Sequence, residues 1–185
     1  AVSVLYNHSF ILAGFAFEEP LWKKYTSMVT FGPLGVDIFF TTSGFLLALS
    51  ILSKKDIFSF ALNRALRIFP GLITAVILMI VITGLFFTQI NFFDFINNNQ
   101  TFQFLKNNST LINGVAYVLP DAFINNPEQS INGSLWTLPI EIYSYCLLIF
   151  LTAISLVTKK YNSYIFTTLI AGAFFLAFFS LAKAY

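Results

Sequence analysis

Hydrophobic positions along the chain fall into five apolar blocks, separated by more polar connections. The blocks cover about residues 1–17, 33–52, 69–88, 135–157 and 163–182. At about 1.5 Å per residue, blocks of this size approach or match the roughly 30 Å of hydrocarbon in a bilayer. Strands with open edges would leave backbone groups unsatisfied in lipid, so the blocks are expected to be helices. The pattern predicts an all-α fold, a polytopic transmembrane helical bundle with about five spans.

Composition agrees with this pattern. Apolar residues make up 57% of the chain and charged residues 10%, whereas soluble domains average about 45–50% and about 25%. A water-soluble globular protein is therefore excluded. The chain has one cysteine and one histidine, so a thiolate metal site is excluded and we expect no bound metal.

Charges in the connections predict the orientation of the spans. Lys54, Lys55, Arg64 and Arg67 lie in the second connection, and Lys159 with Lys160 lies in the fourth. Because positive charge collects on the cytoplasmic side, these connections are expected to be cytoplasmic. Residues 18–32 and 89–134 then face outward.

Two connections carry further expectations. Residues 89–134 are rich in Asn and lack a sustained period, which predicts an irregular extracytoplasmic loop with short helices at most. Residues 56–68 place apolar residues at helical spacing, which favours an interfacial helix leading into the third span at Pro70.

Three ionisable residues fall inside the apolar blocks: His8, Asp37 and Glu141. A charged side chain at bilayer depth costs at least about 2.5–3.5 kcal/mol, so such residues are functional candidates. His8 is the only side chain here whose ordinary pKa suits proton transfer near neutrality. Ser43 adds a hydroxyl after Asp37, and Glu141 follows Pro139 and Trp136, a set of polar groups that could line a cavity.

Arg64 and Arg67 are three residues apart, hence on one helical face. Arginines at a membrane edge often only set topology. Their alternative use is as planar, permanently charged forks for phosphate groups, which would suit a nucleotide-bearing donor.

Four separated stretches, VSVLYNHSF, GVDIFFTTSGFLL, FALNRALRIFP and SLWTLPIEIYSY, occur in the order and rough spacing of one family. The chain resembles the membrane-bound acyltransferase family 3, which contains bacterial O-antigen and nodulation-factor O-acyltransferases. The resemblance covers nearly all of residues 1–185 outside the 89–130 loop, as the N-terminal part of a single acyltransferase transmembrane domain.

The resemblance implies transfer of an acyl group, most often acetyl, from acyl-CoA to a hydroxyl of a cell-envelope glycan or lipid-linked sugar. It implies that His8 and Glu141 are catalytic, that Arg64 and Arg67 bind the donor, and that Trp136 is a further matched position. With Asp37 and Ser43, Trp136 is expected to line the substrate site. The implied partners are acyl-CoA, a carbohydrate acceptor and membrane lipid, with no permanently bound cofactor and no nucleic acid. The expected location is the bacterial inner membrane.

The chain also departs from the family pattern. The family has an Arg eleven residues before its histidine, a position that would precede Ala1, and it typically has about ten spans. We expect the chain to be a fragment of a longer polypeptide that is not necessarily active alone.

An alternative from another functional class is a proton-coupled transporter or flippase subunit. In that case His8, Asp37 and Glu141 would form a proton relay. A relay needs neither phosphate-binding arginines nor a thioester donor, so dependence on CoA separates the two hypotheses.

The positive-inside pattern generates a topological prediction. A cysteine introduced at Asn98, on a background without other cysteines, should react with an impermeant thiol reagent on intact cells, because residues 89–134 are expected to face outward. Labelling that appears only after lysis would invert the predicted orientation.

Overall fold

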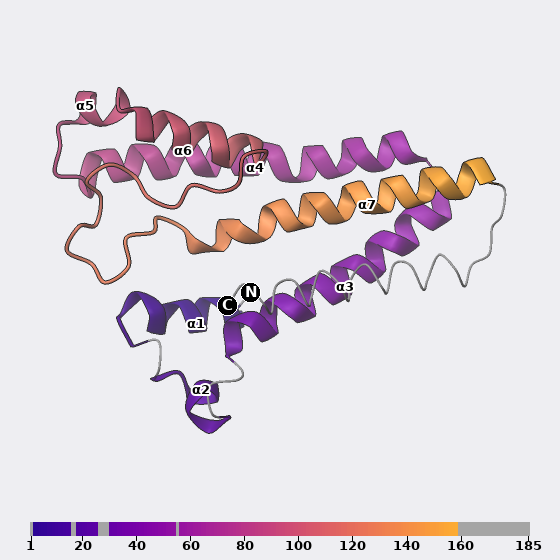
Figure 1. The fold of residues 1–185 in the computed structure, drawn as a ribbon, viewed down its shortest axis with the longest axis horizontal. Helices are drawn as coiled ribbons and strands as arrows, with labels where there is room; N and C mark the ends of the chain where they lie inside the picture. Colours follow the sequence, from indigo (N-terminus) through magenta and orange to yellow (C-terminus); the bar gives the residue numbers. More distant parts are fainter. Residues whose placement is uncertain (1, 16–17, 26–29, 55, 159–185) are drawn as a thin grey trace. The chain divides into compact units, whose positions relative to one another are not determined.

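The computed structural model describes residues 2–15, 18–25, 30–54 and 56–158. These residues form the helices α1 (Val2–Leu12), α2 (Pro20–Lys24), α3 (Phe31–Lys54), α4 (Ile57–Phe86), α5 (Phe92–Ile96), α6 (Asn99–Thr110) and α7 (Thr137–Thr158), with a short 3₁₀ helix, η2 (Gly133–Trp136), before α7 (Figure 1). Within the described ranges the only strand-like pairing is an isolated bridge between Thr88 and Ala122. The predicted all-α fold is confirmed.

Three helical segments in the described residues are long and apolar enough to span a membrane: Phe31–Ile51, Ile57–Phe86 and Gly133–Ile154. They correspond to the second, third and fourth predicted blocks. The fifth predicted block, 163–182, lies outside the described residues. The total of five spans therefore stays a prediction.

The first predicted block ends earlier than expected, because α1 stops at Leu12 and not near residue 17. Gly14 adopts a left-handed φ of 79°. The N–H of Gly14 bonds the carbonyl of Ile11 at 3.0 Å, and that of Phe15 bonds the carbonyl of Phe10 at 2.8 Å. This pair of bonds is a Schellman motif, which satisfies the last carbonyls of the helix and ends it.

The chain divides into two compact units, residues 1–60 with 146–185, and residues 61–145. In the first unit α1 packs against α3. A Cβ at Gly32 would lie 2.6 Å from Asn7 Nδ2, and a Cβ at Gly35 would lie 2.2 Å from Ser3 Oγ. Glycine at both positions thus lets the two helices approach closely, as small residues do between membrane helices.

A buried carboxylate joins the loop after α1 to the start of α3. Glu19 is fully buried, and its Oε1 accepts a hydrogen bond from the N–H of Phe31 at 2.8 Å. This N–H is one of the orphan donors at a helix N-terminus, where negative charge is favoured. The contact fixes the start of α3 next to α1.

In the second unit α4 is continuous from Ile57 to Phe86, with Pro70 inside it. The predicted helix over 56–68 that leads into the third span is present as the first part of α4, and its position at the membrane interface stays a prediction. Proline removes one backbone hydrogen bond but is tolerated in membrane helices when a neighbouring group compensates. The bond that the missing N–H of Pro70 would form is the one to the carbonyl of Leu66, four residues earlier.

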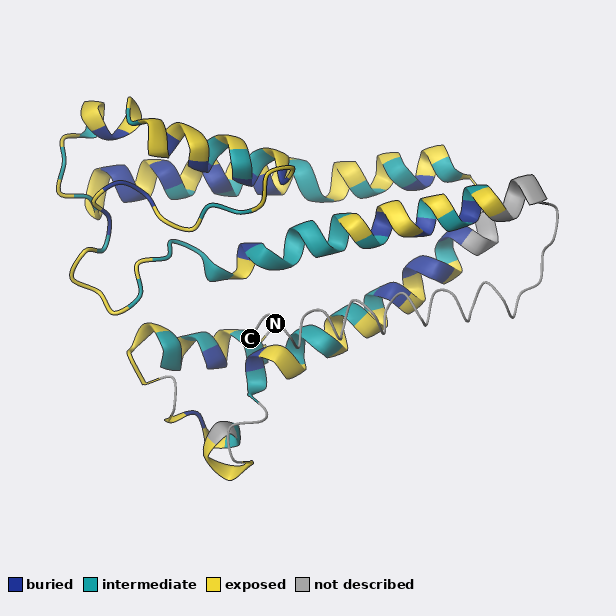
Figure 2. Cartoon of the chain, viewed as in Figure 1, coloured by how far each residue is buried: buried dark blue, intermediate teal, exposed yellow. Residues whose placement is uncertain are grey.

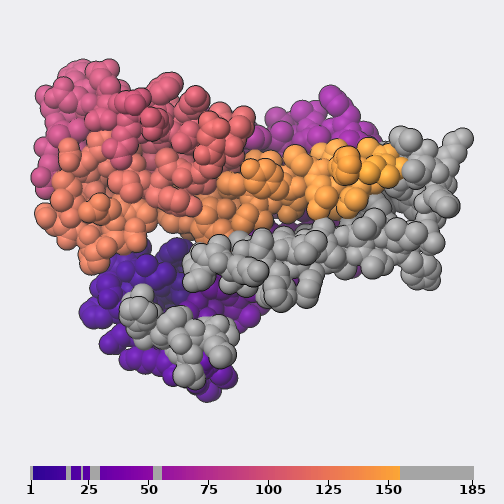
Figure 3. Space-filling view, viewed as in Figure 1, coloured from indigo at the N-terminus to yellow at the C-terminus, as the bar shows by residue number. Residues whose placement is uncertain are grey.

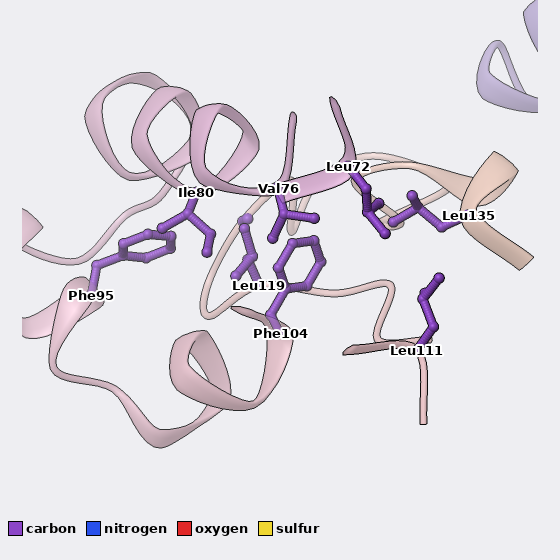
Figure 4. Close-up of a cluster of buried hydrophobic side chains, with 9 residues drawn as sticks. Leu72, Val76, Ile80, Phe95, Phe104, Leu111, Leu119 and Leu135 are labelled. Carbon is purple, nitrogen blue, oxygen red and sulfur yellow. The ribbon is translucent and has the colours of Figure 1, made fainter. Parts of the chain in front are cut away.

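The segment after α4 is more ordered than the irregular loop that was predicted. α5 and α6 lie along the C-terminal half of α4, and they enclose a core of nine residues: Leu72, Val76, Ile80, Phe95, Phe104, Leu111, Leu119, Ala122 and Leu135 (Figure 4). Buried positions recur along this part of α4 in Figure 2. In the space-filling view of Figure 3, α5, α6 and the connection to η2 form one continuous surface.

Asparagine side chains organise this segment. Asn91, Asn98 and Asn132 each cap a helix by accepting a hydrogen bond from a backbone N–H. The fully buried side chain of Asn108 accepts from the N–H of Ala116 at 3.0 Å and donates to its carbonyl at 2.8 Å. The side-chain amide of Asn108 thereby pairs with both backbone polar groups of Ala116, in a connection that has no regular secondary structure.

Gly84 provides a test of this packing. A Cβ at Gly84 would lie 2.7 Å from the ring of Phe95, which is fully buried, whereas a Cβ at Gly71 on the same helix would meet nothing within 4 Å. Gly84→Ala should lower the free energy of unfolding by about 1–3 kcal/mol through overpacking. The matched Gly71→Ala should leave the melting temperature unchanged or slightly higher. Equal melting temperatures for the two variants, measured in detergent, would contradict the packing of α5 on α4.

Candidate active site

The predicted site residues are divided between the two units. His8, Asp37 and Ser43 belong to the first unit, and Arg64, Arg67, Trp136 and Glu141 belong to the second.

His8 lies on α1 and is half-buried. Its neighbour Asn7 is 9% exposed and packs on Gly32 of α3. One turn before His8 on α1, Val4 Cγ2 lies 3.2 Å from the position of a Cβ at Gly35. The glycine contact between α1 and α3 therefore fixes the position of the turn that carries the histidine.

An aromatic contact reinforces this turn. The ring of Tyr6 meets that of Phe31 edge-on, with centroids 5.5 Å apart, and meets that of Phe10 in the same way at 5.1 Å. Edge-to-face pairs of this kind add about 0.5–1.5 kcal/mol beyond area burial. Three aromatic side chains thus flank the segment with His8.

Asp37 lies on α3 and is half-buried. At 100° per residue, Asp37 lies about 140° around α3 from Gly32 and about 200° from Gly35, so it is not on the face that meets α1. Ser43 lies only about 20° from the direction of Gly32, three turns further along. The structure therefore does not place Asp37 on the His8 side of α3, whereas Ser43 shares that side.

In the second unit, Glu141 of α7 is hydrogen-bonded to a residue that sequence reasoning missed. Tyr145 is 6% exposed, and its O–H donates a hydrogen bond to Glu141 Oε1. Arg64 and Arg67 lie on α4, in the same unit. The Glu141–Tyr145 spacing of four residues was the available signal, because residues i and i+4 share a helical face.

Arg64 and Arg67 lie near the start of α4, whereas Glu141 and Tyr145 lie in the apolar helical segment Gly133–Ile154. At about 1.5 Å per residue, the two arginines are about 10 and 15 Å along α4 from its first residue. α4 has 30 residues and is about 45 Å long, which exceeds the roughly 30 Å of hydrocarbon in a bilayer. The expectation of arginines at the membrane edge therefore stays a prediction. The Nε atom of Arg64 is buried, and Arg67 is exposed.

Trp136 is the last residue of η2 and is half-buried. Asn132 caps this turn by accepting from the N–H of Ser134 at 3.0 Å, and the hydroxyl of Thr137 donates to the carbonyl of Ser134 at 3.0 Å. These bonds fix the entry into α7. Trp136, at the end of this turn, precedes Glu141 by five positions in the sequence.

Comparison with known proteins gives two matches. A family model described as an acyltransferase domain matches residues 1–185. An O-acetyl transferase of Shigella phage Sf6 is 31% identical over 150 residues, which cover 78% of this chain and 40% of that protein. The chain thus spans well under two thirds of this relative's length. No solved structure matches.

Proposed function

The chain belongs to the acyltransferase 3 family, and from this membership we propose that the protein transfers an acyl group, most often acetyl, from acyl-CoA to a hydroxyl of a cell-envelope glycan or lipid-linked sugar. The similar phage protein is named as an O-acetyl transferase, which supports O-acylation. The chain is an integral membrane protein. A location in the bacterial inner membrane, where cytoplasmic acyl-CoA is accessible, is part of the proposal.

The observation that carries the proposal is the placement of Arg64 and Arg67 on one face of the continuous helix α4, in the same unit as the hydrogen-bonded pair Glu141 and Tyr145. Two guanidinium groups on one helical face suit the diphosphate of CoA, because each can form two parallel hydrogen bonds to phosphate oxygens.

In the proposed reaction the acceptor hydroxyl attacks the thioester carbonyl of the donor. A sugar hydroxyl is a weak acid, so it needs a base, and the neutral imidazole of His8 takes its proton as the C–O bond forms. The C–S bond then breaks, and the imidazolium returns the proton to the departing thiolate to give free CoA. Glu141 is the second catalytic candidate, and Asp37, Ser43 and Trp136 remain candidates for lining the substrate site.

The first functional prediction concerns His8. In the full-length protein, His8→Ala should abolish acyl transfer while membrane insertion and melting temperature stay near those of wild type, because the base is lost but the Asn7–Gly32 contact remains. Ser9→Ala is the matched control, since its exposed hydroxyl only donates to the carbonyl of Tyr6 at 2.6 Å. Transfer of labelled acetyl at the wild-type rate in His8→Ala would eliminate this assignment.

The second functional prediction concerns the arginines. Arg64→Lys and Arg67→Lys keep the charge but lose the fork, so each should raise the donor KM about ten- to a hundredfold, as expected for a charge-assisted hydrogen bond of about 1.5–3 kcal/mol. The acceptor KM should change little. Lys106→Ala, an exposed change on α6 in the same unit, is the control. Donor KM values equal to wild type in both lysine variants would mean that the arginines do not bind the donor and only set the membrane topology.

Protection by CoA separates an acyltransferase from a proton-coupled transporter. Anything that binds the native state stabilises it by RT ln(1 + [L]/Kd), so saturating CoA should raise the melting temperature of the full-length protein in detergent. A proton relay predicts no such shift.

A further inference from the structure

The reaction proposed above leaves one negative charge without a partner. When the acceptor hydroxyl attacks the thioester carbon, an electron pair of the C=O bond moves to the carbonyl oxygen, which becomes an oxyanion. Catalysts of acyl transfer stabilise this oxygen with hydrogen-bond donors that are held in place beforehand, either backbone N–H groups or side chains such as Asn. Such a donor is expected close to the base, because both groups act on the same tetrahedral intermediate.

Asn7 precedes His8 directly on α1, and its burial sets it apart from the rest of that helix. It is the one buried residue of Val2–Leu12, with 9% of its surface exposed, whereas apolar neighbours such as Leu5 are exposed. Apolar side chains of a membrane protein can face lipid, so their exposure is ordinary. A polar amide in the contact between two helices requires a specific reason.

The ordinary reason is a hydrogen bond between helices, as polar side chains form in membrane proteins. Among the residues that the structure describes, the Asn7 amide has no such bond. The buried amide of Asn108, in contrast, pairs with both backbone groups of Ala116. A buried donor without an acceptor costs about 1–3 kcal/mol. The N–H groups of Asn7 are therefore suited to an acceptor that arrives with a ligand.

Gly32 of α3 provides the space for this amide. A Cβ at Gly32 would lie 2.6 Å from Asn7 Nδ2 and 2.9 Å from Asn7 Cγ, so a side chain there would displace the amide. The rings of Tyr6 and Phe31, the residues just before Asn7 and Gly32, meet edge-on with centroids 5.5 Å apart. These contacts hold the amide in one place, as a donor for an oxyanion must be. Asn7 and His8 are only about 1.5 Å apart along the axis of α1.

We propose that Asn7 is a catalytic residue whose Nδ2 donates a hydrogen bond to the oxyanion of the tetrahedral intermediate. This inference rests on the proposed function, because it takes His8 to be the base for attack on a thioester. His8 removes the hydroxyl proton as the C–O bond forms, while Asn7 stabilises the negative oxygen. When the C=O bond forms again, the C–S bond breaks, and the imidazolium gives its proton to the thiolate.

The experiment measures kcat, donor KM and melting temperature of the full-length protein in detergent. Labelled acetyl-CoA is the donor, and the glycolipid extract of the expressing cells is the acceptor. Asn7→Leu keeps the branched shape of the side chain and removes the donor, so kcat should fall about 10²–10³-fold, the scale of one oxyanion donor. The donor KM and the Kd of CoA should stay near wild type. The melting temperature should be at least that of wild type, because an apolar group replaces an unpaired amide.

Ser3→Ala is the matched control. Ser3 lies four residues before Asn7 on the same face of α1, and its Oγ lies 2.2 Å from the position of a Cβ at Gly35. It thus makes the same kind of contact with α3, one turn away from the histidine. Its kcat should equal that of wild type.

A wild-type kcat in Asn7→Leu would overturn the inference, and so would a loss confined to the donor KM. If Asn7→Leu does not fold or melts at a lower temperature, Asn7→Asp decides, because its carboxylate keeps the shape without the N–H donors. A wild-type kcat in that variant would contradict the assignment. Failure of the proposed function is distinguishable, since His8→Ala would then retain transfer or the wild type would not use acetyl-CoA.

Discussion

The cost of an ionised side chain in a membrane-spanning helix is the constraint on which the polar groups of the second unit depend. Glu141 lies in the apolar segment Gly133–Ile154, and the hydroxyl of Tyr145 gives its carboxylate a hydrogen-bond donor one turn along the same helix. Arg64 and Arg67 lie near the start of α4 and share one face of it. That placement makes the two arginines the residues of this unit best suited to an anionic donor.

Local structure on both helices supports this cluster. α4 continues through Pro70, so the arginines and the apolar face that carries Leu72, Val76 and Ile80 belong to one rigid element. Asn132 and Thr137 fix the turn before α7 and so set the register of Glu141. In the first unit, close approach at Gly32 and Gly35 does the corresponding work for the turn with His8. Steric fit thus positions the turn with the proposed base, and backbone capping positions the start of α7.

The sequence predicted the all-α fold and the family. It also predicted the helices of the second and fourth spans, α3 and α7, to within two residues at each end. These predictions succeeded because long apolar blocks and four spaced motifs are local signals. It did not predict the end of α1, which depends on the left-handed conformation of Gly14. The sequence did not give the bounds of α6, because its buried residues include Thr101 and Asn108, which hydropathy counts as polar. It also gave no sign that Tyr145 donates to Glu141, since that contact depends on the side-chain conformations within α7.

The central claim is that Arg64 and Arg67 of α4 bind the donor. The most direct measurement is an experimental structure of the full-length protein with bound CoA. The account predicts the CoA diphosphate within hydrogen-bond distance of the Arg64 and Arg67 guanidinium groups, with the Glu141 carboxylate still bonded to the Tyr145 hydroxyl. A diphosphate bound elsewhere, with both arginines paired to protein carboxylates, would contradict it.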